Sequence, residues 1–170
     1  MAHFIQSNGP WNQLVELGNI RINKLKEADT ISLSKGLKIE VFTVPHRDEY
    51  SETAGYHIKT QNSAYLFIPD IDKWGKWDQG IVNRVAGVDH AFLDATFFKD
   101  GEIPNRAMSE IPHPFVQETM ALFEQQTDQV KNKIVFIHMN HTNPLLFDQK
   151  IQEKVSKEGY RIAEQGKGYE

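Results

Sequence analysis

The segment from Lys133 to Pro144 constrains the fold more than any other part of this sequence. Residues 134–137 form an unbroken apolar run that is too short and too rich in β-branched and aromatic side chains for an independent helix. Such a run is typical of a strand covered on both faces. Asn143 is expected to cap a helix that begins at Pro144, where the missing N–H costs nothing. A strand that runs into a helix start in this way favours an α/β or α+β domain.

Two histidines, His138 and His141, lie between this strand and the helix start. Functional sites in open α/β sheets collect at the carboxyl ends of the strands, so both imidazoles are candidates for a metal-binding or catalytic role. The alternative is that one is a hydrogen-bonded core histidine and the other a surface loop residue. Spacing alone leaves both interpretations open.

Other polar groups follow apolar strand candidates in the same way. His46 follows residues 42–45, Asp70 follows residues 66–69, and Asp94 interrupts an apolar run. His113 lies between two prolines just before a predicted helix. Each has an ordinary structural explanation as a turn or capping residue, but together they form a ligand set for zinc, iron or manganese.

Composition narrows the class of protein. The chain has 170 residues, a formal net charge of −4 and no cysteine, so any metal must be held by nitrogen and oxygen ligands. The acidic balance argues against nucleic acid or a membrane surface as the main partner. We find no transmembrane-length apolar run and no signal-peptide core, and therefore expect a cytoplasmic location. One domain over residues 1–170 is the economical prediction, with residues 1–10 frayed.

The pattern along the chain predicts strands first and then strands alternating with helices. We predict strands over residues 37–44, 55–61, 64–68, 91–97, 134–137 and 160–163, a hairpin turn at 61–63, and helical segments over 74–85, 114–126 and 144–158, the last followed by a left-handed Gly159. Leu14, Val15 and Leu17 fit either a helix or a strand.

The same segments carry a family resemblance. They are Val44 to Glu49, Gly55 to Ile58, Tyr65 to Asp70, Asp89 to Phe98, His113 and Phe136 to Pro144. The sequence resembles the second half of a metallo-β-lactamase-fold hydrolase, and within that superfamily the pyrroloquinoline quinone biosynthesis protein B group. The resemblance implies half of an αββα sandwich, with a mixed sheet and helices on one face.

The resemblance also implies roles for individual residues. His46 and His138 match metal ligands, Asp70 matches a bridging carboxylate with a catalytic part, and His113 matches a catalytic histidine on the substrate side. His141 is a further candidate ligand, although relatives carry asparagine there. The implied activity is hydrolysis of an ester, amide or phosphodiester in a small-molecule substrate by metal-bound hydroxide. Zinc is the expected metal, with iron or manganese as alternatives. Asp94 is expected to orient a ligand imidazole.

One departure from the family changes these expectations. The His-x-His-x-Asp-His motif of the first half is absent, and the only early histidine is His3. The chain therefore resembles a C-terminal half whose hydrolytic activity is impaired. Half of such a sandwich would expose the inner face of its sheet, so we expect a homodimer or a complex with a separate N-terminal-half partner. The alternative function is a non-catalytic binding or assembly module.

A small doubly wound α/β domain without metal also fits the pattern. No glycine-rich phosphate loop and no Gly-x-Ser-x-Gly elbow occur in the sequence, which argues against a nucleotide-binding domain of that type and against a serine hydrolase.

Overall fold

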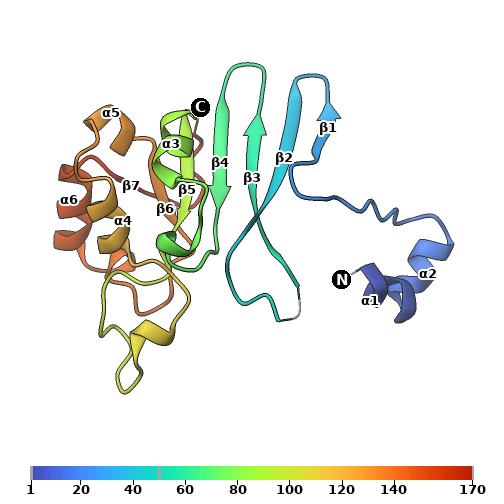
Figure 1. The fold of residues 1–170 in the computed structure, drawn as a ribbon, viewed down its shortest axis with the longest axis horizontal. Coiled ribbons are helices and arrows are strands. Elements are labelled where there is room, and N and C mark those ends of the chain that lie inside the picture. Colours follow the sequence, from blue (N-terminus) through green and yellow to red (C-terminus); the bar gives the residue numbers. More distant parts are fainter. Residues whose placement is uncertain (1, 50, 170) are drawn as a thin grey trace.

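A computed structural model of the chain describes residues 2–49 and 51–169. Its centre is a seven-stranded sheet whose spatial order follows the sequence from β1 to β7 (Figure 1). The strands are β1 (Thr30–Ser34), β2 (Leu37–Val44), β3 (Thr53–Lys59), β4 (Ala64–Ile68), β5 (His90–Asp94), β6 (Ile134–Ile137) and β7 (Arg161–Ile162). Pairing is antiparallel from β1 to β4 and parallel from β4 to β7, so the sheet is mixed as predicted.

The helices are short. They are α1 (Ala2–Ser7), α2 (Trp11–Glu16), α3 (Ile81–Ala86), α4 (Val116–Leu122), α5 (Asp128–Lys131) and α6 (Gln149–Lys157), with 3₁₀ helices η1 (Trp74–Lys76), η2 (Met108–Glu110) and η3 (Pro144–Leu146). The described residues include no helix that is both long enough and apolar enough to cross a membrane.

The predicted hairpin between β3 and β4 is present, with a small shift in its bounds. Strands 37–44 and 64–68 are confirmed, whereas the strand predicted at 55–61 occupies Thr53–Lys59. It ends early because the hydroxyl of Thr60 accepts hydrogen bonds from the N–H groups of Asn62 and Ser63, which draws the chain into the turn. Strand β1 and helices α1 and α5 are not predicted by the sequence pattern, and the apolar stretch near Leu14 is helical.

Two predicted helices are shorter than expected. The helix predicted over 144–158 is divided into η3 and α6, because Asp148 accepts hydrogen bonds from the N–H groups of Lys150 and Ile151 and starts a second helix. Asn143 caps η3 as predicted, by accepting a hydrogen bond from the N–H of Leu145. The helix predicted over 114–126 contains only Val116–Leu122.

Strand β5 also ends earlier than predicted, at Asp94 and not at residue 97. The carboxylate of Asp94 accepts a hydrogen bond from the N–H of Thr96 at 2.8 Å, which turns the chain out of the sheet. The predicted helical segment over 74–85 is interrupted at Gly80, which has a φ of 58° between η1 and α3. The predicted left-handed Gly159 is confirmed, with a φ of 93°.

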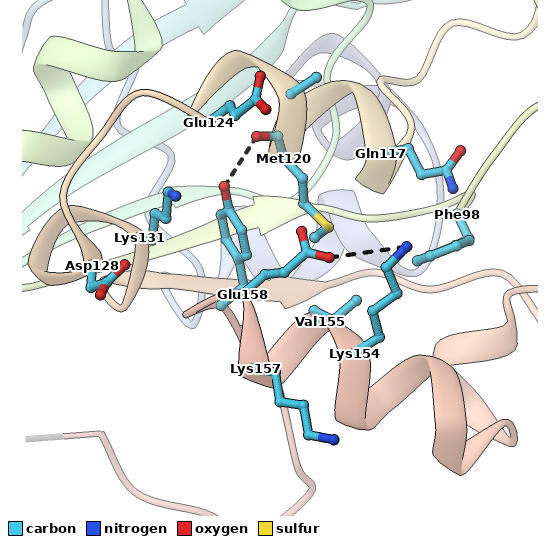
Figure 2. A pocket seen from close by; sticks show the side chains of 12 residues that line it. Phe98, Gln117, Met120, Glu124, Asp128, Lys131, Lys154, Val155, Lys157 and Glu158 are labelled. Atoms are coloured by element: carbon cyan, nitrogen blue, oxygen red, sulfur yellow. Dashed lines mark hydrogen bonds and ion pairs between the residues drawn. The ribbon is translucent and has the colours of Figure 1, made fainter.

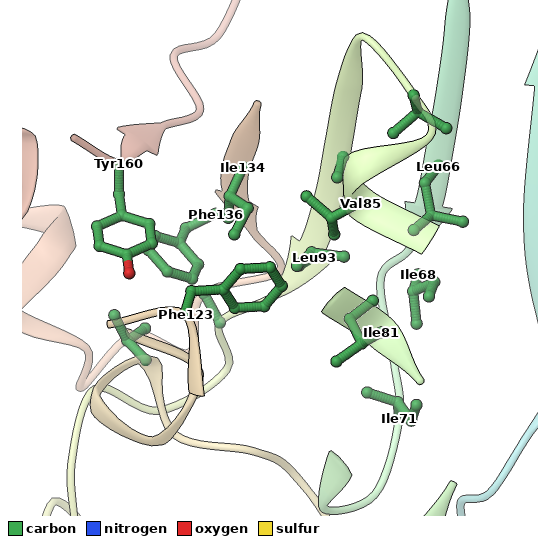
Figure 3. Packing of buried hydrophobic residues seen from close by; sticks show 14 of the residues in the cluster. Leu66, Ile68, Ile71, Ile81, Val85, Leu93, Phe123, Ile134, Phe136 and Tyr160 are labelled. Atoms are coloured by element: carbon green, nitrogen blue, oxygen red, sulfur yellow. The ribbon is translucent and has the colours of Figure 1, made fainter. Parts of the chain in front are cut away.

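The hydrophobic core lies between one face of the sheet and the helices (Figure 3). Leu66, Leu93 and Phe136 from adjacent strands pack with Val85 of α3 and with Phe123, which follows α4, and all are buried. Close packing extends to the backbone of β3, where a β-carbon on Gly55 would approach the Phe42 ring to 2.4 Å. The prediction of helices on one face of a mixed sheet is therefore confirmed.

The opposite face of the sheet is also apolar. Val41, Tyr56, Phe67 and Phe92 are register partners across β2, β3, β4 and β5, and their neighbours in sequence point into the core. The ring centroids of Tyr56 and Phe67 are 6.4 Å apart, as are those of Phe67 and Phe92. Unlike the core residues, these four side chains are only partly buried. We call these four residues, three of which are aromatic, the aromatic row.

Candidate metal centre

The strand ends bring the predicted polar residues to one edge of the sheet. Asp94 is the last residue of β5, Asp70 follows β4 and His138 follows β6, and these three strands are parallel. His46 follows β2, which is antiparallel to β3 and therefore runs in the same direction as β4. His113 reaches the same edge from the loop before α4.

Asp70 is at the centre of the first group of contacts. Its Oδ1 lies 3.1 Å from Nε2 of His46 and 3.4 Å from Nδ1 of His113. The rings of His46 and His113 have centroids 5.1 Å apart, and those of His113 and His138 are 6.1 Å apart. Three of the four predicted histidines, His46, His113 and His138, therefore form one contiguous cluster with Asp70.

Asp94 is a buried carboxylate whose acceptor positions are all used. Oδ1 accepts from the N–H of Thr96 at 2.8 Å and from its hydroxyl at 2.7 Å. Oδ2 accepts from Nδ1 of His113 at 2.8 Å and from the N–H of Ile71 at 3.2 Å. Burial disfavours the charged carboxylate, but the contacts with His113, His138 and Thr96 outweigh it and lower the pKa of Asp94 below its ordinary value.

His138 is held differently. Its Nδ1 is 3.0 Å from the hydroxyl of Thr96 but 3.9 Å from Asp94, too far for a direct hydrogen bond. The backbone of His138 is left-handed, with a φ of 62°, a conformation that is uncommon for residues other than glycine and often occurs at functional sites. The carboxylate of Asp94, aided by Asp70, raises the pKa of His138 against the opposing effect of burial.

The donor set fits a divalent metal. Asp70, Asp94, His113 and His138 each place one potential ligand atom within 4.8 Å of the others. Oδ1 of Asp70 and Nδ1 of His46 are buried and have no hydrogen-bond partner. A buried carboxylate oxygen without a donor is costly unless a cation compensates it, and nitrogen and oxygen ligands suit zinc, iron or manganese. Because the hydrogen bonds of Asp94 are already complete, we assign it to orienting the imidazoles rather than to ligation.

His141 lies outside this cluster. It is exposed, and its Nδ1 lies 3.1 Å from the side-chain oxygen of Asn140. The structure thus brings His46, Asp70, His113 and His138 together and leaves His141 on the surface of the loop.

Sequence reasoning missed two residues that support the site. Thr96 connects Asp94 with His138, and the buried Asn143 donates its side-chain N–H to the carbonyl of Ala95 at 2.6 Å. Asn143 was recognised only as a helix cap. The Asp-x-Thr spacing after an apolar strand, which permits a side-chain turn, was the available signal for Thr96.

A cavity of about 440 Å³ lies elsewhere, against α4, α5 and α6 (Figure 2). Met120, Val155 and Tyr160 contribute apolar surface, and the hydroxyl of Tyr160 donates to the carbonyl of Met120 at 3.1 Å. Lys154 of α6 and Glu158, one turn further along the chain, line the same side of the cavity, with Nζ and Oε1 4.0 Å apart. We call this the helix cleft. None of the clustered histidines or aspartates lines it.

Comparison with known proteins gives a consistent result. "Coenzyme PQQ synthesis protein B" of Gluconobacter oxydans is 30% identical over 149 residues, covering 79% of this chain and 48% of that protein. The chain thus spans about half the length of this curated relative. The structure of Zn²⁺-bound PqqB from Methylobacterium extorquens matches with a TM-score of 0.70 and 19% identity, over 94% of this chain and 62% of that one.

A family model described as the β-lactamase superfamily domain matches residues 2–139. That match covers most of the chain, including β1 to β6 and the residues His46, Asp70, Asp94, His113 and His138. The fold agrees with it, since the structural match with PqqB covers 94% of this chain. The chain therefore belongs to the β-lactamase superfamily domain family.

Proposed function

We propose that this chain forms part of a metal-dependent hydrolase centre, in which Asp70, His46 and His138 hold a divalent metal and His113 faces the substrate. The observation that carries the proposal is the approach of His46 and His113 to Oδ1 of Asp70, a buried oxygen without a hydrogen-bond donor, with a potential ligand atom of His138 within 4.8 Å of one of Asp70. Zinc is the first candidate, supported by the zinc in the similar PqqB structure, and the same ligands accept iron or manganese.

Each residue has a role that follows from its contacts. A bound divalent ion would acidify a water molecule and polarise the ester, amide or phosphodiester that is hydrolysed. His113 donates its Nδ1–H to Asp94, so its Nε2 has a free lone pair for a proton or for the metal. Asp94 keeps that ring orientation fixed from a fully buried position.

The ligand set is incomplete for two metals. Catalytic zinc sites use about three protein ligands per ion, and the sequence contains no His-x-His-x-Asp-His motif that could complete a second position. We therefore propose that hydrolysis by this chain alone is weak, and that a partner polypeptide supplies the remaining ligands.

Metal titration of chelator-treated protein tests the proposal. We expect the wild type to bind about one equivalent of Zn²⁺, and Asp70→Asn and His138→Ala each to weaken binding by about tenfold or more. His141→Ala is the matched comparison, because it removes an exposed imidazole three residues along the same loop. Retention of less than about a tenth of an equivalent by the wild type, unchanged in His138→Ala, would overturn the metal proposal.

A second candidate function is a non-catalytic assembly module. It is favoured by the aromatic row, which remains partly exposed on the sheet face opposite the core. Helices α1 and α2 project away from the sheet (Figure 1) and carry the exposed Phe4 and Trp11. Apolar surface on both regions is typical of a protein that pairs with a second chain.

We propose that a second copy of this chain, or a separate chain equivalent to the first half of the family fold, covers the aromatic row. Light scattering at micromolar concentration is the test. A dimer that dissociates in Phe67→Lys, but persists in the matched Lys59→Glu variant at the exposed end of β3, is expected. A wild type that is strictly monomeric would exclude the homodimer.

A further inference from the structure

We infer that Thr96 is a positioning residue for the metal centre: its hydroxyl fixes which ring nitrogen of His138 carries the proton, and so leaves Nε2 free to bind a metal. The inference rests on the proposed function for its consequence. Its structural part concerns only residues of this chain and can be tested without metal.

The argument begins with the hydrogens available between Asp94 and His138. A carboxylate accepts hydrogen bonds and donates none. Since the Thr96 hydroxyl lies 2.7 Å from Oδ1 of Asp94, its single hydrogen points to that oxygen. The hydroxyl oxygen is then an acceptor toward Nδ1 of His138 at 3.0 Å, so this nitrogen must carry the hydrogen.

The consequence is that the imidazoles of His113 and His138 are both in the Nδ1–H tautomer. His113 donates Nδ1–H directly to Oδ2 of Asp94, and His138 donates Nδ1–H to the same carboxylate through the Thr96 hydroxyl. Both rings then keep the lone pair on Nε2. A carboxylate that is hydrogen-bonded to a ligand histidine commonly fixes the tautomer of that histidine. Here the hydroxyl of Thr96 bridges the same carboxylate to a second imidazole.

The surroundings of Thr96 leave its hydroxyl little freedom. Its side chain is nearly buried, and its N–H is also bound to Asp94. Its carbonyl accepts from the N–H of Asn140 at 3.0 Å, which ties β5 to the loop that follows His138. The hydroxyl is therefore held between Asp94 and the left-handed His138, whose backbone conformation sets the direction of the ring.

A purely structural role for Thr96 predicts a different outcome. In that case the N–H bond to Asp94 and the carbonyl bond to Asn140 would be sufficient, and the hydroxyl would be dispensable for the ring of His138. Substitutions that keep the backbone bonds and change only the hydroxyl separate the two possibilities.

The experiment uses the chelator-treated 170-residue chain labelled with ¹⁵N-histidine, examined by NMR at a pH where the imidazoles are neutral. In the wild type we expect His138 to be the Nδ1–H tautomer. In Thr96→Val we expect a mixture of tautomers and an affinity for Zn²⁺ lower by about tenfold. Thr96→Ser should restore both properties, and Thr96→Ala gives the same hydroxyl loss without added bulk if the valine variant does not fold.

The matched control is Thr119→Val. Thr119 is also buried and also makes a double contact, accepting from Nε1 of Trp74 at 2.9 Å and donating to the carbonyl of Phe115 at 3.2 Å. Loss of its hydroxyl should leave the His138 tautomer unchanged.

The outcomes separate the inference from the proposed function. Wild-type tautomer and wild-type Zn²⁺ affinity in both Thr96→Val and Thr96→Ala would overturn the inference while the metal proposal stands. A tautomer change in these variants, in a wild-type protein that binds no Zn²⁺, would support the positioning role and overturn the proposed function.

Discussion

The strand-end cluster and the helix cleft hold similar polar groups in very different ways. At the cluster, Asp94 is fully buried and every oxygen lone pair has a donor. At the helix cleft, the side chains of Lys154 and Glu158 are 69% and 47% exposed, and their closest approach is 4.0 Å. Buried polar groups whose hydrogen bonds are all satisfied, more than the volume of a cavity, therefore indicate the candidate site of chemistry in this molecule.

Among the substitutions considered, removal of the Asp94 carboxylate should lower the free energy of unfolding most. Asp94→Ala leaves the N–H of Thr96, the N–H of Ile71 and Nδ1 of His113 without their acceptor in a buried position. We expect a loss of about 3–5 kcal/mol in the free energy of unfolding, measured by urea denaturation.

The matched carboxylate in the helix cleft is Glu124, which is exposed. Glu124→Ala should change the free energy of unfolding by less than about 0.5 kcal/mol. Equal effects of the two substitutions would contradict the distinction between the buried, hydrogen-bonded carboxylate of Asp94 and the solvated carboxylate of Glu124.

Tyr160 is the one strongly held polar group of the helix cleft, and its substitution should have an intermediate effect. Tyr160→Phe removes the hydrogen bond to the carbonyl of Met120 and should cost about 1 kcal/mol. Burial, followed by Glu158 and Glu124, raises the pKa of Tyr160 to about 12.

The unfolded chain ionises a tyrosine at a pH of about 10. The neutral phenol therefore stabilises the fold fully below that pH, and the contribution is lost as the pH rises towards 12. Phenolate absorbance and urea denaturation across this range should show the loss in the wild type, reduced in Tyr160→Phe. A normal titration of Tyr160 would contradict the burial of its phenol group.

His138 should produce a smaller dependence of stability on pH, because its side chain is 46% exposed. Its pKa is raised by Asp94, so in metal-free protein the charged ring stabilises the fold fully below the unfolded value of about 6.5. This contribution is lost as the pH rises through the higher folded value. Thermal unfolding from acidic to mildly alkaline pH should show that slope in the wild type and a weaker one in His138→Gln, with His141→Gln as the control.

The smallest effect should come from the ion pair between Lys154 and Glu158, which are one turn apart at the C-terminal end of α6, beside the helix cleft. Lys154→Ala removes an exposed partner from Glu158, and such pairs contribute little in water. The free energy of unfolding should change by less than about 0.5 kcal/mol. Added salt should alter this difference between wild type and variant by no more than about the same amount. A clearly larger loss would mean that the helix cleft is held as firmly as the strand-end cluster.

Much of the site was predictable because it depends on local pattern. Asp70 and His138 follow short apolar strands, and parallel strands bring their carboxyl ends to the same edge. The lengths of the helices were less predictable, because side chains such as that of Asp148 compete for backbone N–H groups and restart the helix.

The sequence pattern is sufficient to predict a mixed sheet with histidines and aspartates at its edge, since strand periodicity and turn chemistry act over a few residues. It cannot rank His138 above His141, because both follow the same strand within a few positions. The family resemblance favours His138, and the folded chain supplies the physical reason. Thr96, just after β5, and His113, from a distant loop, both contact Asp94. Thr96 also contacts the ring of His138, whereas the ring of His141 lies against Asn140 outside the cluster.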